Sequence, residues 1–399
     1  MGVQHMRIHD QQNIAVSVFF GLAVILYSVT APAQDKKPAW KGKVETENGV
    51  KIVKNPAEPL YGEFVFDLRE DLVFGGDPAK EESYFPSGAV LSVDGEGNFY
   101  VADFGNRRVQ MFDKAGKFVR QIGRQGQGPG EYGHPSRVFF AGEGNPCVWG
   151  GSELIHYDKN GVYKKKVLLK TFLSNFILGP RDTIIGTTQP RIGPGGPKYS
   201  IVQLNPDGTP LRTLAEYRGE YNENQKAVAF HAYSNGIAFS PLTAELFAYG
   251  FSGEYRIYIA DADGQIAHVI AKDEKPLPIS GKEKDQTKKH GIYASFGASE
   301  KREDAVVFPD HRPFFGRFFN DDAGRLYVMK SSSIFDKDSP KRIDVFSNDG
   351  IFLYKMTWSF VPAAIKAGCL YEVHEDKETS EFSIVRHRIE NWGAMKAGL

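Results

Sequence analysis

Turn signals at a nearly constant spacing constrain this chain more than any other feature. Short runs that begin with Asp, Asn or Ser and end three residues later in Gly separate pairs of β-rich segments, at residues 113–116, 158–161, 205–208, 261–264 and 347–350. The final glycines lie 45, 47, 56 and 86 residues apart. Hairpins repeated at about this period are typical of four-stranded propeller blades, and inserted loops account for the longer intervals.

The segments around these turns indicate the number of blades. Two further strand candidates precede each hairpin; in the first unit, residues 89–93 and 98–103 precede 109–113 and 118–122. A sixth unit near the end of the sequence has only three candidates, and residues 62–76 supply the fourth by pairing with residues 382–389. The sequence therefore predicts an all-β, six-bladed propeller of four-stranded blades, closed by an N-terminal strand that joins the last blade.

Composition excludes some partners. The 399 residues carry 49 Lys and Arg against 49 Asp and Glu, so no basic field exists to attract nucleic acid. Cys147 and Cys369 are the two cysteines, and they fall on the second strands of the second and sixth units. Because these strands lie too far apart for a disulfide, we expect both thiols to be free.

The N-terminal segment has the pattern of an export signal. Residues 14–29 are apolar and uncharged, and Ala31-Pro32-Ala33 follows them. We predict a signal peptide over residues 1–33 with cleavage between Ala33 and Gln34, a periplasmic or secreted location, and no stable membrane span after cleavage. The alternative is an uncleaved anchor, because sixteen apolar residues nearly span a bilayer. Residues 34–60 are expected to form an extension, and residues 61–399 the propeller, with a partly helical insertion near 272–312.

The first blade resembles a known repeat. It matches the NHL repeat, with a Gly-Asn before the second strand, Val-x-Asp at its end and Asn-x-Arg-Val into the third, at Gly97, Asn98, Val101, Asp103, Asn106, Arg108 and Val109. The following Gly-Gln-Gly-Pro-Gly-Glu run resembles the linker of secreted bacterial six-bladed propellers. The resemblance covers roughly residues 85–140 and implies that fold and location.

The charged residues of this repeat are expected to be structural. Asp103 ends one strand and Arg108 opens the next, so the two side chains can close the turn as an ion pair, with Asn106 between them. We therefore interpret Asp103, Asn106 and Arg108 as a turn rather than a reaction site.

Ligand-binding candidates precede the innermost strands of the blades. In propellers these connections gather on one face, at the mouth of the central channel. The candidates are His134, Arg137, Arg191, His231, Tyr233, His311 and Arg312. We expect a monomeric, non-catalytic protein that binds a peptide, a glycan, a small molecule or a partner protein there, since no complete catalytic set is visible in the sequence.

A metal-assisted lyase or hydrolase is the alternative. His134, His231 and His311 precede innermost strands of different blades, an arrangement similar to that of amidating-lyase propellers, which hold zinc with His from separate blades. In such an enzyme, Arg137 or Arg312 would stabilise a carboxylate or an oxyanion, and Tyr233 would act as the base. Lactonase-like propellers hold calcium with Asp, Asn and Glu, and the innermost strand segments show no such set.

Overall fold

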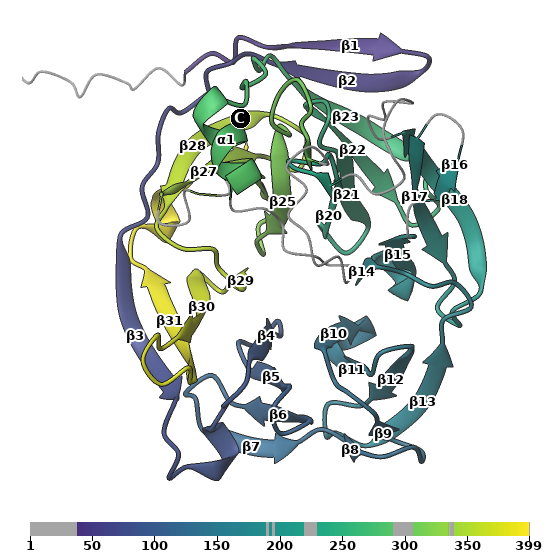
Figure 1. Cartoon of the computed structure of the whole chain (residues 1–399), viewed down its shortest axis with the longest axis vertical. Helices are drawn as coiled ribbons and strands as arrows, with labels where there is room; N and C mark the ends of the chain where they lie inside the picture. Colours follow the sequence, from purple (N-terminus) through teal and green to yellow (C-terminus); the bar gives the residue numbers. More distant parts are fainter. Residues whose placement is uncertain are drawn as a thin grey trace, which may run out of the picture. The chain divides into compact units, whose positions relative to one another are not determined.

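Six antiparallel sheets surround a common axis in the computed structural model (Figure 1). The structure describes residues 38–188, 191–193, 196–218, 230–289, 306–333, 335 and 339–398. The predicted signal peptide lies outside these residues. The six-bladed architecture expected from the sequence is thus present in the unit that begins at Ala39.

Each blade is built on four strands, which are consecutive in the chain except in blade 3, where β16 (Arg191–Gly193) intervenes, and in blade 6. Blade 1 comprises β4 (Ala89–Val93), β5 (Phe99–Asp103), β6 (Arg108–Phe112) and β7 (Phe118–Gln121), and blade 2 comprises β10 (Arg137–Ala141), β11 (Asn145–Trp149), β12 (Glu153–Tyr157) and β13 (Tyr163–Leu168). Blade 3 comprises β14 (Asn175–Leu178), β15 (Ile184–Thr187), β17 (Gly196–Leu204) and β18 (Pro210–Arg218), and blade 4 comprises β20 (Ile237–Pro241), β21 (Leu246–Phe251), β22 (Arg256–Asp261) and β23 (Ile266–Lys272). Blade 5 comprises β25 (Phe315–Asn320), β26 (Leu326–Lys330), β27 (Lys341–Phe346) and β28 (Phe352–Trp358), and blade 6 comprises β29 (Ala364–Lys366), β30 (Cys369–Glu375) and β31 (Phe382–Ile389) with β3 (Leu68–Gly75).

The predicted turns join the two outer strands of blades 1 to 5. In the first, Asp113 Oδ1 accepts the backbone N–H of Ala115 at 2.9 Å and of Lys117 at 3.0 Å, while Gly116 has φ +74°. A side chain that bonds its own turn, followed by a residue with positive φ, specifies a tight hairpin. A register shift just before each of these turns increases the twist of the outer strands.

The N-terminal segment runs along the outer strands of three blades. β1 (Lys43–Glu47) and β2 (Val50–Asn55) form a hairpin, and β2 pairs in parallel with β23 of blade 4. Leu60 and Tyr61 then donate to the β28 backbone of blade 5, and β3 pairs antiparallel with β31 of blade 6. We call residues 43–75 the N-terminal belt. The stretch expected to be a plain extension, residues 34–60, therefore contains a hairpin that widens blade 4.

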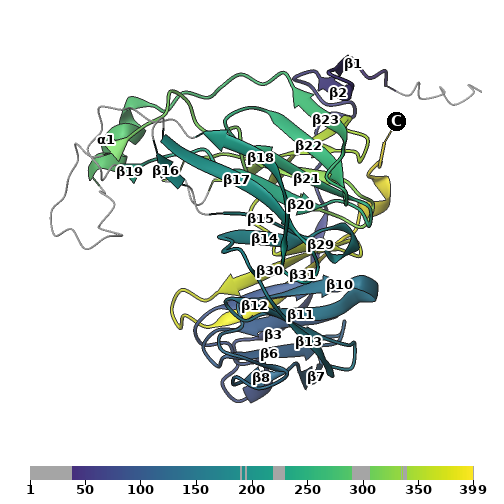
Figure 2. The ribbon, with the colours of Figure 1, turned by 90° about the vertical axis from the view of Figure 1, so that its right-hand side faces the viewer.

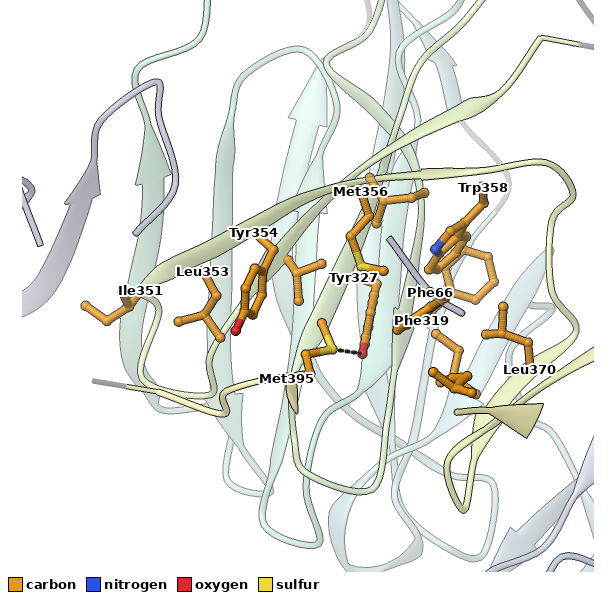
Figure 3. Packing of buried hydrophobic residues seen from close by; sticks show 14 of the residues in the cluster. Phe66, Phe319, Tyr327, Ile351, Leu353, Tyr354, Met356, Trp358, Leu370 and Met395 are labelled. Atoms are coloured by element: carbon orange, nitrogen blue, oxygen red, sulfur yellow. Dashed lines mark hydrogen bonds between the residues drawn. The ribbon is translucent and has the colours of Figure 1, made fainter. Parts of the chain in front are cut away.

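Buried apolar clusters fill the spaces between neighbouring blades, one for each of the six pairs. Figure 3 shows the cluster between blades 5 and 6, where Tyr327 and Trp358 pack near Leu370. Phe66 of the N-terminal belt and Met395, near the other end of the chain, complete this cluster. Both ends of the described chain thus contribute to the same core.

The long connection between blades 4 and 5 carries the helix α1 (Gly281–Lys289), where the sequence predicts helical turns. Seen edge-on, α1, β16 (Arg191–Gly193) and β19 (Phe230–His231) lie on one face of the ring (Figure 2). The remaining short elements are β8 (Arg124–Gln125), β9 (Glu131–Tyr132), β24 (Val306–Val307) and the 3-10 helices η1 (Glu81–Ser83), η2 (Gly142–Gly144), η3 (Pro180–Asp182) and η5 (Trp392–Ala394). Within the described residues, no helix has the length and apolar character needed to cross a membrane.

Candidate functional site

The innermost strands β4, β10, β14, β20, β25 and β29 line a cavity of about 880 Å³ on the axis of the ring. We call it the central channel, and Figure 1 views the ring along this axis. Backbone and apolar side chains form most of its wall. The polar side chains that reach it are Ser92, Arg137, Asn175, Ser240, Arg317, Asn320 and Lys366.

Arg137 is the first residue of β10 and enters the channel from blade 2. Its guanidinium group lies 5.8 Å from the ring centroid of Phe139, two residues along the same strand. Burial in the channel wall lowers the pKa of Arg137 from its usual value. The side chain nevertheless remains a cation at neutral pH, because a guanidinium group does not deprotonate in proteins.

Arg317 enters the channel from blade 5, which faces blade 2 across a ring of six (Figure 1). Its guanidinium group lies 4.8 Å from the ring centroid of Phe319. The pairing of β25 with β26 shifts register between Phe315 and Arg317, so Gly316 is an extra residue in β25. Such a bulge changes the direction of the neighbouring side chain. The surrounding protein atoms, and then the charge of Arg137, lower the pKa of Arg317, although the side chain is exposed to the solvent in the channel.

The channel carries an excess of positive charge. Among the described residues that line it, Arg137, Arg317 and Lys366 are cationic and none is a carboxylate. Lys366 Nζ lies 2.8 Å from Asp322 Oδ1, which balances its charge. In the part of the chain that the structure describes, Arg137 and Arg317 contact aromatic rings but no carboxylate. The two arginines therefore stand on opposite walls with no acidic partner among the described residues.

A side pocket of about 200 Å³ lies between blades 2 and 3. Its lining comprises Ser136, Arg137, Phe139, Trp149, Leu173, Ser174, Asn175 and Phe176. Phe176 stacks on Phe139 with ring centroids 4.7 Å apart and meets Trp149 edge-on at 4.9 Å. Arg137, Phe139 and Asn175 also line the central channel, so the side pocket adjoins it.

Tyr233 and Arg312, two of the residues singled out from the sequence, meet at α1 rather than in the channel lining. Tyr233 donates its hydroxyl to Glu283 Oε1 at 2.9 Å, and Arg312 Nη2 donates to Glu283 Oε2. The Arg312 guanidinium also lies 6.0 Å from the Tyr233 ring centroid. Tyr233 has φ +58°, a costly conformation for a bulky residue, and these contacts help to hold it.

The proposed metal ligands are described only in part. His134 is exposed in the connection before β10, and His311 Nδ1 lies 2.9 Å from the backbone oxygen of Arg312. The side chains of His231 and Arg191 lie outside the described residues. Among the side chains that are described, no group of three His, Cys, Asp or Glu residues is placed to hold a metal ion. The metal set stays a prediction.

The NHL-like turn of blade 1 is built from the residues expected there. Arg108 Nε donates to Asp103 Oδ2 at 3.0 Å, and Asn106 Nδ2 donates to the same oxygen at 2.8 Å. Asp103 is fully buried at this turn. Its carboxylate forms an ion pair with Arg108 that closes the connection between β5 and β6.

Sequence reasoning missed Arg317, although a signal was present. Arg137 and Arg317 both stand in the sequence Arg-x-Phe, within the first strand of a blade and among apolar neighbours. An isolated charge in such a strand is unusual, because innermost strands are largely apolar in this chain. Only the closed ring shows that the two side chains share one cavity.

Fold and channel together define a six-bladed β-propeller with a cationic axial cavity. The chain belongs to the DUF5128 family, described as a 6-bladed beta-propeller, whose model matches residues 88–350. A comparison with curated proteins finds no match.

Solved structures of similar topology come from several bacteria. A protein of Bacteroides fragilis described as exported is 12% identical, with 85% of this chain and 99% of that chain covered and a TM-score of 0.47. A DUF4221 family member from Bacteroides vulgatus is 11% identical, with coverages of 81% and 98% and a TM-score of 0.48. A gluconolactonase from Xanthomonas campestris is 14% identical, with coverages of 76% and 88% and a TM-score of 0.38. Likeness at this level does not bear on activity, which must be argued from the site.

Proposed function

We propose that this protein is an extracytoplasmic binding propeller that holds a small molecule in its central channel without transforming it. The cavity of about 880 Å³ is the observation that carries the proposal. Small-molecule sites are concave, roughly 300–1,000 Å³ in volume, and mostly apolar with a few polar groups that fix orientation. The channel has this composition, with Asn175, Ser240 and the two arginines among apolar walls. The apolar segment and Ala-x-Ala site near the N-terminus support the location.

A channel-blocking substitution tests this proposal. Gly316 lines the channel and is exposed, and a Cβ there would meet no atom within 4 Å, so Gly316→Trp places a bulky ring in the channel beside Arg317 with little strain. We expect compounds that raise the melting temperature of the unaltered protein, found in a screen of organic acids, sugars and peptides, to lose this effect in G316W. Gly95, in an exposed turn with equal space around it, provides the control Gly95→Trp. Compounds that still stabilise G316W bind elsewhere and refute the channel as the site.

The same screen addresses the metal-assisted lyase or hydrolase. The described channel lining holds no His, Cys, Asp or Glu, the side chains that ligate zinc, and no carboxylate for calcium. Zinc and calcium are therefore added to the protein, each in turn, in the same melting-temperature screen. A rise in melting temperature that EDTA reverses and that His311→Ala removes would favour the metal-assisted function over the binding function.

A further inference from the structure

We propose that the channel binds an organic anion whose carboxylate or phosphate group lies between Arg137 and Arg317, and whose ring-shaped apolar part enters the side pocket. This inference rests on the proposed function and names the class of its ligand. The observation behind it is that two cations on facing walls of one cavity have no carboxylate partner in the part of the chain that the structure describes.

The two guanidinium groups repel each other in the empty protein, where Arg137 is half-buried and Arg317 is exposed at the channel wall. Charges of one sign that share a cavity are normally balanced by a partner of the opposite sign. The chain as a whole has equal numbers of basic and acidic residues, so a carboxylate partner is not in short supply. Residues that break such a rule are expected at functional sites. An anionic group between the two guanidinium groups would relieve their repulsion.

Guanidinium groups suit carboxylate and phosphate better than other anions. Their planar N–H donors match the oxygens of these groups in a bidentate geometry. Phe139 and Phe319 lie beside Arg137 and Arg317, at 5.8 and 4.8 Å from guanidinium to ring centroid, within the range of cation–π attraction. This attraction favours the arginine rotamers that keep the guanidinium groups at the channel wall, which lowers the entropy that they lose on binding.

The side pocket indicates what the rest of the ligand is like. Arg137 lines both cavities, so an anionic group bound to it leaves the attached part of the molecule at the pocket entrance. Phe139 and Trp149, both half-buried, line this pocket on either side of the buried Phe176, so their accessible edges can contact a ring. Asn175, Ser136 and Ser174 add polar groups to the lining.

Titration calorimetry with simple probes tests the ligand class. Benzoate and phenyl phosphate carry the two anionic groups on one ring, and benzamide is the uncharged counterpart of benzoate. We expect at least one anion to bind more than tenfold more tightly than benzamide, and more weakly as salt is added. The tighter of the two anions identifies carboxylate or phosphate as the preferred group. Equal binding of benzoate, phenyl phosphate and benzamide would overturn the inference.

Variants of the arginines separate this inference from a general effect of charge. Arg137→Gln and Arg317→Gln should each weaken binding of the preferred anion about tenfold or more. Lys159→Gln is the control for the change in net charge, because Lys159 lies outside the channel lining and is paired with Glu96, and it should leave affinity unchanged. Trp149→Leu should weaken binding of the aromatic anion while leaving that of inorganic phosphate unaltered.

The empty protein provides a readout that needs no ligand. Arg317→Gln removes the repulsion between the two cations, so its melting temperature should rise by about 1–2 °C. A fall in melting temperature would contradict the claim that Arg317 is an uncompensated charge. If neutral compounds bind in the channel, are lost in G316W and are unaffected by both arginine variants, the proposed function stands and this inference fails. If no compound binds the channel, both fail.

Discussion

Two buried histidines have a protonation state that differs between the folded and the unfolded protein. Burial lowers the pKa of His156 and of His268 to about 4, so both imidazoles are neutral in the folded state at neutral pH. His156 Nδ1 lies 3.0 Å from Cys147 Sγ, and burial raises the pKa of that thiol to about 12. The pair is therefore a neutral hydrogen bond in the wall of blade 2, rather than a reactive thiolate beside an imidazolium.

We expect stability to fall on acidification from pH 7 to pH 5. In that window the unfolded chain protonates these histidines near pH 6.5, whereas the folded chain does not until about pH 4. The unfolded state then binds more protons, which lowers the free energy of unfolding by about 2 kcal/mol per histidine at pH 5. In urea unfolding experiments, His268→Leu should lose only about half as much free energy of unfolding between pH 7 and pH 5 as the unaltered protein. A variant of the exposed His134 should lose as much as the unaltered protein. An unchanged pH dependence in H268L would rule out His268 as a source.

Single residues were predictable from the sequence where their role is local. The two free thiols are confirmed, since Cys147 and Cys369 are buried and unpaired. Arg137 was singled out because it precedes an innermost strand. Arg317 was not, because its position in the channel depends on the bulge at Gly316 and on closure of the ring. Neither is a property of neighbouring residues in the sequence.

Among the elements, α1 depends on one carboxylate. Ser280 and Glu283 cap the helix reciprocally, with Glu283 N–H donating to Ser280 Oγ at 3.3 Å and Ser280 N–H to Glu283 Oε2 at 3.2 Å. Burial would raise the pKa of Glu283, but hydrogen bonds from Arg312, Ser333, Tyr233 and Ser280 lower it to about 2. Glu283 thus joins the helix to the rest of the unit as an ionised group.

Glu283→Gln should loosen α1 while leaving the ring folded. The substitution removes the charge that Arg312 and Tyr233 recognise, at a local cost of about 1–3 kcal/mol. Limited trypsin digestion should therefore cut faster at Lys282, Lys284, Lys288 and Lys289, with little change in the main melting transition. Asp285→Asn, which alters an exposed carboxylate of the same helix, is the control and should digest normally. Equal digestion of E283Q and the unaltered protein would contradict this role.

Elements were predictable where turn chemistry marks them. The outer hairpins of blades 1 to 5 follow from an Asp, Asn or Ser side chain that forms hydrogen bonds within its own turn, and from a glycine with positive φ three residues later. The hairpin of β1 and β2 was not predicted, because residues 34–60 lie outside the repeated blade units of the sequence. Their partner, β23, lies more than 200 residues further along the chain: Asn55 Nδ2 donates to the backbone oxygen of Ala271, 216 residues away.

At the scale of the molecule, the ring is closed by the N-terminal belt. β3 pairs with β31, Asp71 Oδ1 accepts from Arg386 Nε at 2.7 Å, and Phe74 packs against Phe112 of blade 1 with ring centroids 4.7 Å apart. The family match, residues 88–350, includes neither the belt nor blade 6. These parts therefore have to be understood from this chain's own contacts.

Deleting residues 34–78 should abolish a single cooperative unfolding transition. The deletion removes β3 from blade 6, the hairpin from blade 4 and the segment bonded to β28 of blade 5. Exposed sheet edges then remain on three blades. Calorimetry should show a lower and broader transition than that of the chain beginning at residue 34. A truncated protein that melts like the longer one would refute the role of the belt in closing the ring.

The belt also ties folding to the order of synthesis. Asp71 and its partner Arg386 are 315 residues apart, so the closing strand leaves the ribosome long before the strand that it must pair with. Contacts of such long range are reached late and slowly. During that interval the blades already made present unpaired edges, a known hazard for aggregation. We therefore expect the nascent chain to need a chaperone until its last blade is complete, and its folding to finish only after translation ends.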